Sequence, residues 1–301
     1  MGLRETELLP DLQEAGIMVG IPELSKGQFD IVYNTTSFAL AAMLFVSIFL
    51  LVSQGRVLPR YRTALVISAM VTGIATYHYF RIFDNFKDAY VSTVADGSGA
   101  YALANDLAFN EGYRYVDWLL TVPLLLVETV AILAVTQTES RRLLLRLVPA
   151  SALMIILGYP GEVATDNLTR GVWGAVSTIP FLYILYILFV ELTKSIDAQP
   201  GEARDWVKNL RWVLLASWGF YPIAYMFPMI GFEGADAFVA RQVGYSVADV
   251  IAKAVFGLLI YRIARIKSFY DDADFARQEL STKDVVADQP PEPESVTSAA
   301  K

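Results

Sequence analysis

The strongest constraint in this sequence is a series of apolar stretches, each about as long as a bilayer is thick. A helix needs roughly twenty apolar residues to cross ~30 Å of hydrocarbon. Seven such stretches occur, over residues 28–54, 60–86, 105–135, 142–159, 171–194, 207–231 and 237–266. With 55% hydrophobic and 18% charged residues, the chain is also too apolar for an ordinary soluble domain. The sequence therefore predicts an all-α membrane protein, a bundle of seven transmembrane helices.

The rest of the composition argues against several classes of function. The chain has no cysteine, which excludes disulfides, thiol catalysis and thiolate metal sites. Its single histidine, His78, cannot make an imidazole-rich metal centre. A net charge of -7 argues against a nucleic-acid partner, because the phosphate backbone selects clustered lysine and arginine.

Lysine and arginine gather beside alternate ends of the predicted spans. One set of connections is rich in them: Arg56, Arg60, Arg62, Arg141, Arg142, Arg146, Lys194, Arg204, Lys208, Arg211, Arg262, Arg265 and Lys267. The alternate connections hold chiefly Lys87, Arg170 and Arg241. Since basic residues favour the cytoplasmic side, the N-terminus is predicted outside and the C-terminus in the cytoplasm.

Three regions follow from this pattern. Residues 1–27 are predicted to be an extracellular N-terminal segment, and residues 28–267 the seven-helix domain. Residues 268–301 are acidic and rich in proline towards their end, which predicts a disordered cytoplasmic tail. Between the second and third spans, the aromatic and β-branched residues 90–94 precede a turn sequence at 96–99, which predicts a small β-hairpin.

Lys253 lies near the middle of the seventh span, where its ammonium group cannot easily reach either membrane surface. It must be paired, neutral or covalently modified. Asp249 is four residues earlier and therefore lies on the same helix face. A buried ion pair bracing the bundle is one interpretation, but such pairs rarely improve on apolar packing. We favour the other, because a buried lysine amine can condense with an aldehyde.

The third span carries two acids at different depths. At ~100° per residue, Asp117, Thr121 and Glu128 fall within about 40° of one another, and the two acids are ~16 Å apart along the axis. They could be hydrogen-bonded core acids, but two carboxylates on one stripe of a membrane helix more often mark a proton route. Because this span starts outside, Asp117 is predicted in the outer half and Glu128 in the inner half.

Two segments carry a resemblance to a known family. The sequences RYVDWLLTVP at 114–123 and DVIAK at 249–253 resemble those of microbial rhodopsins, specifically the proteorhodopsin and xanthorhodopsin branch. The similarity runs through all seven spans and leaves out the two tails. It implies a light-driven outward proton pump in the inner membrane of a bacterium, and not an enzyme.

The resemblance also assigns roles to the polar residues. It implies that Lys253 binds all-trans retinal covalently as a Schiff base, with Asp117 as primary counterion and proton acceptor. Asp249 becomes the second counterion, and Glu128 the cytoplasmic proton donor. Thr121 completes the Asp, Thr, Glu triplet of outward proton pumps in this branch.

Further positions follow from the same resemblance. His78 is expected to pair with the primary counterion, and Arg114 to shield its outer side. The retinal pocket is expected to consist of Tyr115, Trp118, Leu125, Gly158, Trp218, Tyr221, Pro222 and Tyr225. Aromatic residues three or four apart also pack ordinary membrane helices. The set therefore indicates a retinal pocket only in combination with Lys253. Leu125 matches the position at which green proteorhodopsins have leucine and blue ones glutamine. Pro222 is expected to kink its helix.

Several alternatives stay open. A photosensory rhodopsin that signals through a partner is the main one, although sensors often lack the inner carboxylic donor that Glu128 provides. A chloride pump would need an uncharged residue at 117, and a sodium pump would carry Asn, Asp and Gln at 117, 121 and 128. A retinal-free receptor is disfavoured by Lys253.

The proton and membrane lipid are the expected partners, and any further partner is inferred only from the resemblance to the family. Members with a carotenoid antenna have a glycine beside the retinal ring, where Ser151 is aligned in this chain, so a second pigment is left open. A homo-oligomer, pentamer or trimer, is expected because such assemblies are common in the family.

Overall fold

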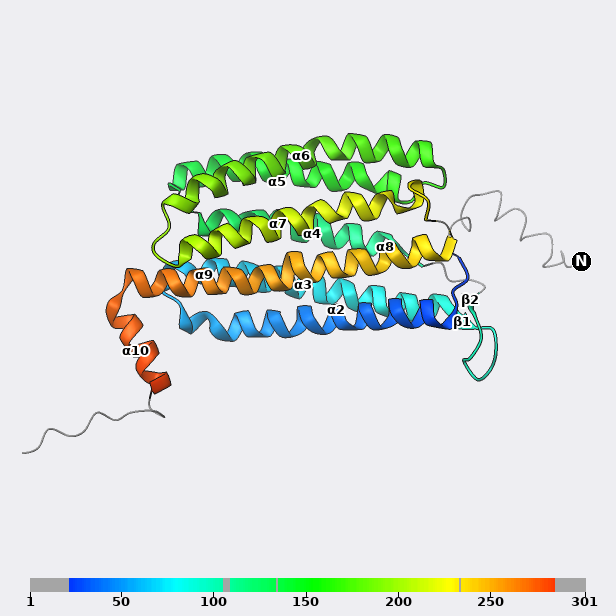
Figure 1. Ribbon diagram of the computed structural model, residues 1–301, viewed down its shortest axis with the longest axis horizontal. Helices are drawn as coiled ribbons and strands as arrows, with labels where there is room; N and C mark the ends of the chain where they lie inside the picture. Colours follow the sequence, from blue (N-terminus) through cyan, green and yellow to red (C-terminus); the bar gives the residue numbers. More distant parts are fainter. Residues whose placement is uncertain (1–21, 105–108, 134, 233, 285–301) are drawn as a thin grey trace, which may run out of the picture.

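The computed structural model describes residues 22–104, 109–133, 135–232 and 234–284. Long helices run side by side through the described part of the chain (Figure 1). They are α2 (Lys26–Val52), α3 (Pro59–Ala89), α4 (Gly112–Ile132), α5 (Gln137–Glu162), α6 (Asn167–Asp197), α7 (Ala203–Met226) and a last run made of α8 (Gly234–Asp249), the π-helical segment η4 (Val250–Val255) and α9 (Phe256–Asp271). The predicted seven-helix bundle is confirmed.

Six of these helical runs are long and apolar enough to cross a membrane. The last of them extends without a break over Gly234–Asp271. Helix α7 has 24 residues, which is also enough to span a bilayer, but its first part carries the charged residues Arg204, Asp205, Lys208 and Arg211, which lower its mean hydropathy. The chain is therefore a multi-pass membrane protein.

Local sequence sets the helix ends. Ser25 caps α2, because its hydroxyl accepts from the Gln28 amide while the Gln28 side chain accepts from the Ser25 amide. Thr136 and Glu139 form the same reciprocal cap at the start of α5. The third span begins later than predicted, at Gly112, whose amide donates to the Asn110 side chain.

A two-stranded hairpin joins α3 and α4, as predicted. Strands β1 (Tyr90–Ser92) and β2 (Tyr101–Leu103) are antiparallel, with Tyr90 opposite Leu103. Gly97 has a φ of 73°, which favours glycine in the turn between them. We call this side of the bundle the hairpin end and the opposite side, where the C-terminal helix lies, the tail end (Figure 1).

The prediction of a disordered tail from residue 268 is wrong for its first part. Helix α9 continues to Asp271, and α10 (Ala273–Asp284) follows it. The Asp272 carboxylate accepts from the amides of Asp274 and Phe275 and so caps α10. Arg265 forms an ion pair of 2.9 Å with Glu279, which ties α10 to α9. Residues 285–301 and 1–21 lie outside the described residues.

The bundle is apolar on its surface, and its largely apolar interior also holds a group of buried charged residues. Large apolar side chains project outward, among them Phe38, Phe45, Ile179 and Tyr186. The buried charged residues include Arg114, Asp117, Glu128, Asp249 and Lys253. Because intramembrane charges are costly, they mark the site on which the function depends.

Candidate functional site

Lys253 extends from the π-helical segment in the last membrane helix. Residues Val250–Val255 form this segment, between the regular α-helices α8 and α9. Such π-helical turns occur mostly as single insertions and often at functional sites. The lysine side chain is only 1% exposed, so its amine lies inside the bundle and away from both membrane surfaces.

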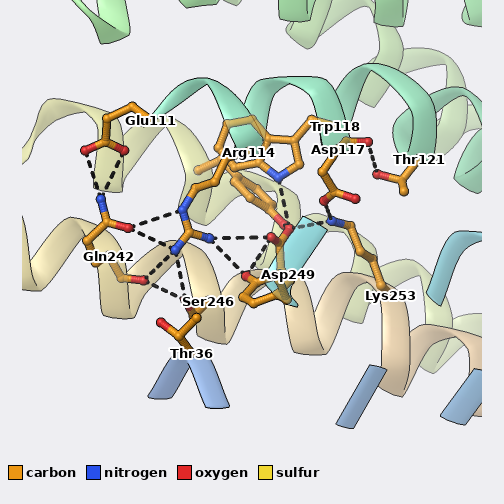
Figure 2. Close-up of polar contacts among 12 residues, drawn as sticks. Thr36, Glu111, Arg114, Asp117, Trp118, Thr121, Gln242, Ser246, Asp249 and Lys253 are labelled. Atoms are coloured by element: carbon orange, nitrogen blue, oxygen red, sulfur yellow. Dashed lines mark hydrogen bonds and ion pairs between the residues drawn. The ribbon is translucent and has the colours of Figure 1, made fainter. Parts of the chain in front are cut away.

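The Lys253 amine lies between two carboxylates (Figure 2). Its Nζ contacts Oδ2 of Asp117 on α4 and lies 3.0 Å from Oδ1 of Asp249 on α8. All three side chains are about 1% exposed. The structure therefore brings together the three residues that the sequence singled out, and a buried ammonium ion is balanced by two buried acids.

Asp249 is held by many donors. Tyr79 donates to Oδ2 at 2.8 Å, while Trp118 and Tyr221 donate to Oδ1. Arg114 lies 3.8 Å away on the hairpin-end side and donates to the Tyr79 hydroxyl. Both oxygens of this carboxylate are thus satisfied, and hydrogen bonds of this kind stabilise the charged form.

Asp117 is held less completely. Its Oδ2 contacts Lys253, but its Oδ1 is buried with no hydrogen-bond partner among the described residues. Thr121 donates to the main-chain carbonyl of Asp117 and not to the carboxylate. Nδ1 of His78 is likewise buried without a partner in the described part, and the expected bond between His78 and Asp117 is not formed. Asp117 therefore keeps one free acceptor oxygen.

Arg114 occupies the hairpin-end side of the site. Its guanidinium donates to the Gln242 side chain at 3.0 Å and to the Ser246 hydroxyl at 3.1 Å. Figure 2 shows the order from Glu111 and Gln242 through Arg114 to the two aspartates and Lys253. A continuous polar chain thus leads from the lysine towards the hairpin end.

Glu128 lies apart from this cluster, further along α4 towards the tail end. It is fully buried, and the Ser68 hydroxyl of α3 donates to its Oε2 at 2.5 Å. Its Oε1 has no partner, and no ion pair of Glu128 occurs within the described ranges. A buried carboxyl group without a cation is far more stable neutral than charged.

An apolar cavity extends from Lys253 between α4, α5, α6 and α7. Its lining includes every pocket residue expected from the sequence: Tyr115, Trp118, Leu125, Gly158, Trp218, Tyr221, Pro222 and Tyr225. Met154, Ile155, Phe181 and Gly174 also line it. A mostly apolar cavity that meets a buried primary amine fits a long apolar aldehyde.

The alignment that placed Ser151 beside this cavity is wrong. Ser151 is buried and donates to the Val148 carbonyl of its own helix, and it is not part of the cavity lining. It lies one turn closer to the tail end than Met154 and Ile155, which do line the cavity. Gly174 on α6 lines it instead, where a Cβ would come within 2.7 Å of the Tyr225 ring.

Several residues of the site were not anticipated from the sequence. They are Tyr79, Ser68, Gln242, Ser246, Glu111, Glu162 and Arg241. Their contacts join helices far apart in the chain, so spacing alone could not reveal them. The one available signal was that Glu162 and Arg241 are charged at the ends of apolar spans.

This fold and site define a class: a seven-helix membrane protein with a buried lysine between two carboxylates at the end of an apolar cavity. The family model for bacteriorhodopsin-like proteins matches residues 32–267. The chain belongs to this family, and within it to the proteorhodopsin and xanthorhodopsin branch of the microbial rhodopsins.

Individual relatives agree with this placement. Green-light absorbing proteorhodopsin from Gamma-proteobacterium EBAC31A08 is 29% identical over 257 residues, which cover 83% of this chain and 94% of the relative. The crystal structure of xanthorhodopsin, described as a light-driven ion pump with dual chromophore, matches with a TM-score of 0.77 and 46% identity, covering 84% of this chain and 99% of the other. A thermophilic rhodopsin matches equally well, with the same values.

Proposed function

We propose that this chain is a light-driven pump that moves protons outward across a bacterial inner membrane, with retinal bound covalently through Lys253. The observation that carries the proposal is the arrangement of two acids on α4. Asp117 contacts the Lys253 amine, whereas Glu128 is buried nearer the tail end without a cation. A vectorial pump needs one acid to receive a proton on the exit side and another to return one on the entry side.

The cavity supports retinal as the cofactor. Its apolar and aromatic lining would enclose the polyene, and the Lys253 amine would form the Schiff base. When bound, retinal supplies the light-driven isomerisation that changes the position and proton affinity of the nitrogen on Lys253. Everything else in the cycle depends on the surrounding side chains.

Asp117 is the better proton acceptor of the two aspartates. A proton on Asp249 would weaken the charge-assisted hydrogen bonds from Tyr79, Trp118 and Tyr221. Asp117 has an oxygen without any described donor, so protonation there costs less. We therefore assign the proton that leaves Nζ of Lys253 to Asp117, while Asp249 stays charged beside Arg114.

Glu128 is suited to return the proton. Its burial without a cation keeps the carboxyl group neutral at rest, so it has a proton to give. Ser68 holds its Oε2, which fixes the carboxyl group on the face of α4 that also bears Asp117. Glu128 would then be refilled from the tail end.

The distribution of basic residues supports the direction. Basic residues gather at the tail end, among them Arg56 between α2 and α3, Arg141 near the start of α5 and Arg204 near the start of α7, whereas few lie at the hairpin end. By the positive-inside rule the tail end faces the cytoplasm, so Asp117 lies on the outer side of Glu128. Assembly into a pentamer or trimer stays a prediction.

The substitution Glu128→Gln tests this function against a sensor. It keeps the shape of the side chain but removes the transferable proton. Flash photolysis should show normal loss of the proton to Asp117, followed by a deprotonated state that lasts ~100-fold longer or more. Azide, a small proton carrier, should restore the rate. If the deprotonated state decays at the normal rate in Glu128→Gln and pumping is unchanged, Glu128 is not the proton donor, and the proposed mechanism is contradicted.

A carotenoid antenna is a separate proposal, supported by Gly174 rather than by Ser151. This glycine lines the cavity from α6, and its neighbours Val172 and Val176 are exposed on the lipid face. A second pigment could therefore approach the cavity from the membrane. Excitation spectra with and without added carotenoid test it: energy transfer should require the carotenoid and disappear in Gly174→Trp, provided that the retinal band is retained.

A further inference from the structure

An arginine lies between α6 and α7 at the tail end, where the end of the first helix leads into the start of the second (Figure 1). Nη1 of Arg211 on α7 donates to the Thr193 hydroxyl of α6 at 2.8 Å. We propose that Arg211, together with Lys208, binds the phosphate of an anionic membrane lipid in the leaflet at the tail end. This inference does not depend on the proposed function.

Two aromatic rings hold the Arg211 guanidinium in place. Its Cζ lies 4.8 Å from the centroid of the Phe189 ring and 5.1 Å from that of the Trp212 ring. The two rings also contact each other edge to face, with centroids 6.5 Å apart. A ring face attracts a cation, and the planar guanidinium stacks well on it. The guanidinium is therefore already ordered before an anion arrives, which lowers the entropic cost of binding.

The site faces lipid rather than the interior of the bundle. Phe189 is 37% exposed and Trp212 53%, and Thr193 is exposed beside them. Arg211 is eight residues after Ala203, so its Cα lies ~12 Å along the axis from the start of α7. Side chains lean towards the N-terminus of their helix, which for α7 is the tail end. The guanidinium can therefore extend to the layer of lipid headgroups, as arginine commonly does near the end of a membrane helix.

Arg211 has no acidic partner among the described residues, unlike basic residues close to it in the fold. Lys194, near the end of α6, is paired with Glu191 at 3.0 Å. Arg204, near the start of α7, is paired with Asp197 at 3.3 Å. Nε of Arg211 is moreover buried without a hydrogen bond from the described part of the chain. A partly desolvated cation without a counter-charge favours the binding of an anion.

A second cation lies on the same face of α7. Lys208 is three residues before Arg211, which places it about one turn nearer the tail end. Its side chain is exposed and takes part in no ion pair within the described ranges. One phosphate between the two side chains would meet both charges, and the guanidinium can bond two of its oxygens.

The surface of α6 favours a lipid over a free phosphate ion. Exposed apolar and aromatic side chains three or four residues apart form one stripe that leads from the site towards the middle of the membrane: Ile179, Leu182, Tyr186 and Phe189. An acyl chain can pack along this stripe while the phosphate of the same molecule contacts Arg211. Basic sites between membrane helices on the cytoplasmic side commonly bind anionic headgroups in this way.

Native mass spectrometry of the full chain in detergent tests the site by counting bound lipids. The chain is mixed with phosphatidylglycerol or with phosphatidylcholine, whose headgroup has no net charge, and should prefer phosphatidylglycerol. Arg211→Gln and Lys208→Gln should each bind phosphatidylglycerol roughly fivefold more weakly. The control is Arg60→Gln, which removes an exposed arginine at the same end whose charge is already paired with Asp271 at 3.1 Å. It should leave the binding unchanged.

A large excess of inorganic phosphate distinguishes a lipid from a soluble anion. It should not displace phosphatidylglycerol, because it cannot pack along α6. If it does, the site takes a free anion and the lipid assignment is wrong. A helical circular dichroism spectrum shows that each variant is folded, and if Arg211→Gln is not, Lys208→Gln tests the same site. Binding of phosphatidylglycerol that is equal in the folded variants and the unmodified chain, or equal to that of phosphatidylcholine, overturns the proposal.

Discussion

Nζ of Lys253 lies 3.0 Å from Oδ1 of Asp249, one turn earlier on the same membrane helix. The aspartate keeps this position because residues of α3, α4 and α7 donate to it, namely Tyr79, Trp118 and Tyr221. A fully satisfied carboxylate is a fixed counter-charge rather than a proton carrier. This contrast is why we propose Asp117, on the other side of the same amine, as the proton acceptor.

The variant Lys253→Ala should have no visible absorption band when retinal is supplied, because it lacks the buried amine to which we propose that retinal binds. It also leaves two buried acids without their cation, which costs about 3–5 kcal/mol. If the variant does not fold, Lys253→Arg keeps the charge and should be equally colourless. Lys267→Ala, which changes a buried lysine at the tail end, should stay coloured. A pigment formed by either Lys253 variant contradicts the site assignment.

Leu125→Gln should move the absorption maximum to shorter wavelength. Leu125 is buried and lines the cavity, so a polar amide there would stabilise the ground and excited states of the pigment unequally. The direction follows the difference between green and blue proteorhodopsins. Leu125→Met, which conserves volume and polarity, should leave the maximum in place. The absorption spectrum of each purified variant tests this prediction. An unshifted maximum in Leu125→Gln would contradict it.

Ser68→Ala should slow the return of the proton from Glu128, but much less than Glu128→Gln does. Its hydroxyl provides the one hydrogen bond described for the Glu128 carboxyl group. A hydrogen bond contributes ~1 kcal/mol, which corresponds to roughly a fivefold change in rate. Ser47→Ala removes a buried hydroxyl bonded to the Ala69 carbonyl instead and serves as the control. Equal decay times in the two variants would show that Ser68 does not position the donor.

Gly161→Ala should destabilise the protein, whereas Gly219→Ala should not. A Cβ at Gly161 would clash with the Tyr225 hydroxyl and lie 3.2 Å from the Arg170 carbonyl. Such overpacking costs about 1–3 kcal/mol. Nothing lies within 4 Å of a Cβ at Gly219, where alanine should gain about 0.5–1 kcal/mol in the helix. The temperature at which each variant loses its visible band measures its stability. Equal stabilities of Gly161→Ala and Gly219→Ala would contradict the packing described.

Patterns within single helices could be predicted from the sequence, and contacts between helices could not. The apolar runs located the spans, and the four-residue step from Asp249 to Lys253 put both on one face. The ion-paired cluster of Glu111, Glu162 and Arg241 escaped because charged residues at the ends of spans are normally solvated.

Two expectations failed for the same physical reason. Ser151 is on the cavity side of α5 but lies one turn beyond the residues that line the cavity. Helical periodicity predicts which face of a helix a residue occupies, but not which residue of that face lies at the depth of the cavity. The start of the tail looked disordered by its charge, yet the Asp272 cap and the Arg265–Glu279 ion pair hold α10 against α9. Both outcomes depend on neighbours that no local pattern contains.

The most direct test of the outward pump is the pH of an illuminated suspension of cells that make this protein with retinal. The medium should become acidic in the light and recover in the dark, and a protonophore should abolish the change. Asp117→Asn, which removes the proton acceptor, should give no acidification although the chain is folded. No light-driven change, or a medium that becomes alkaline, would contradict outward proton pumping.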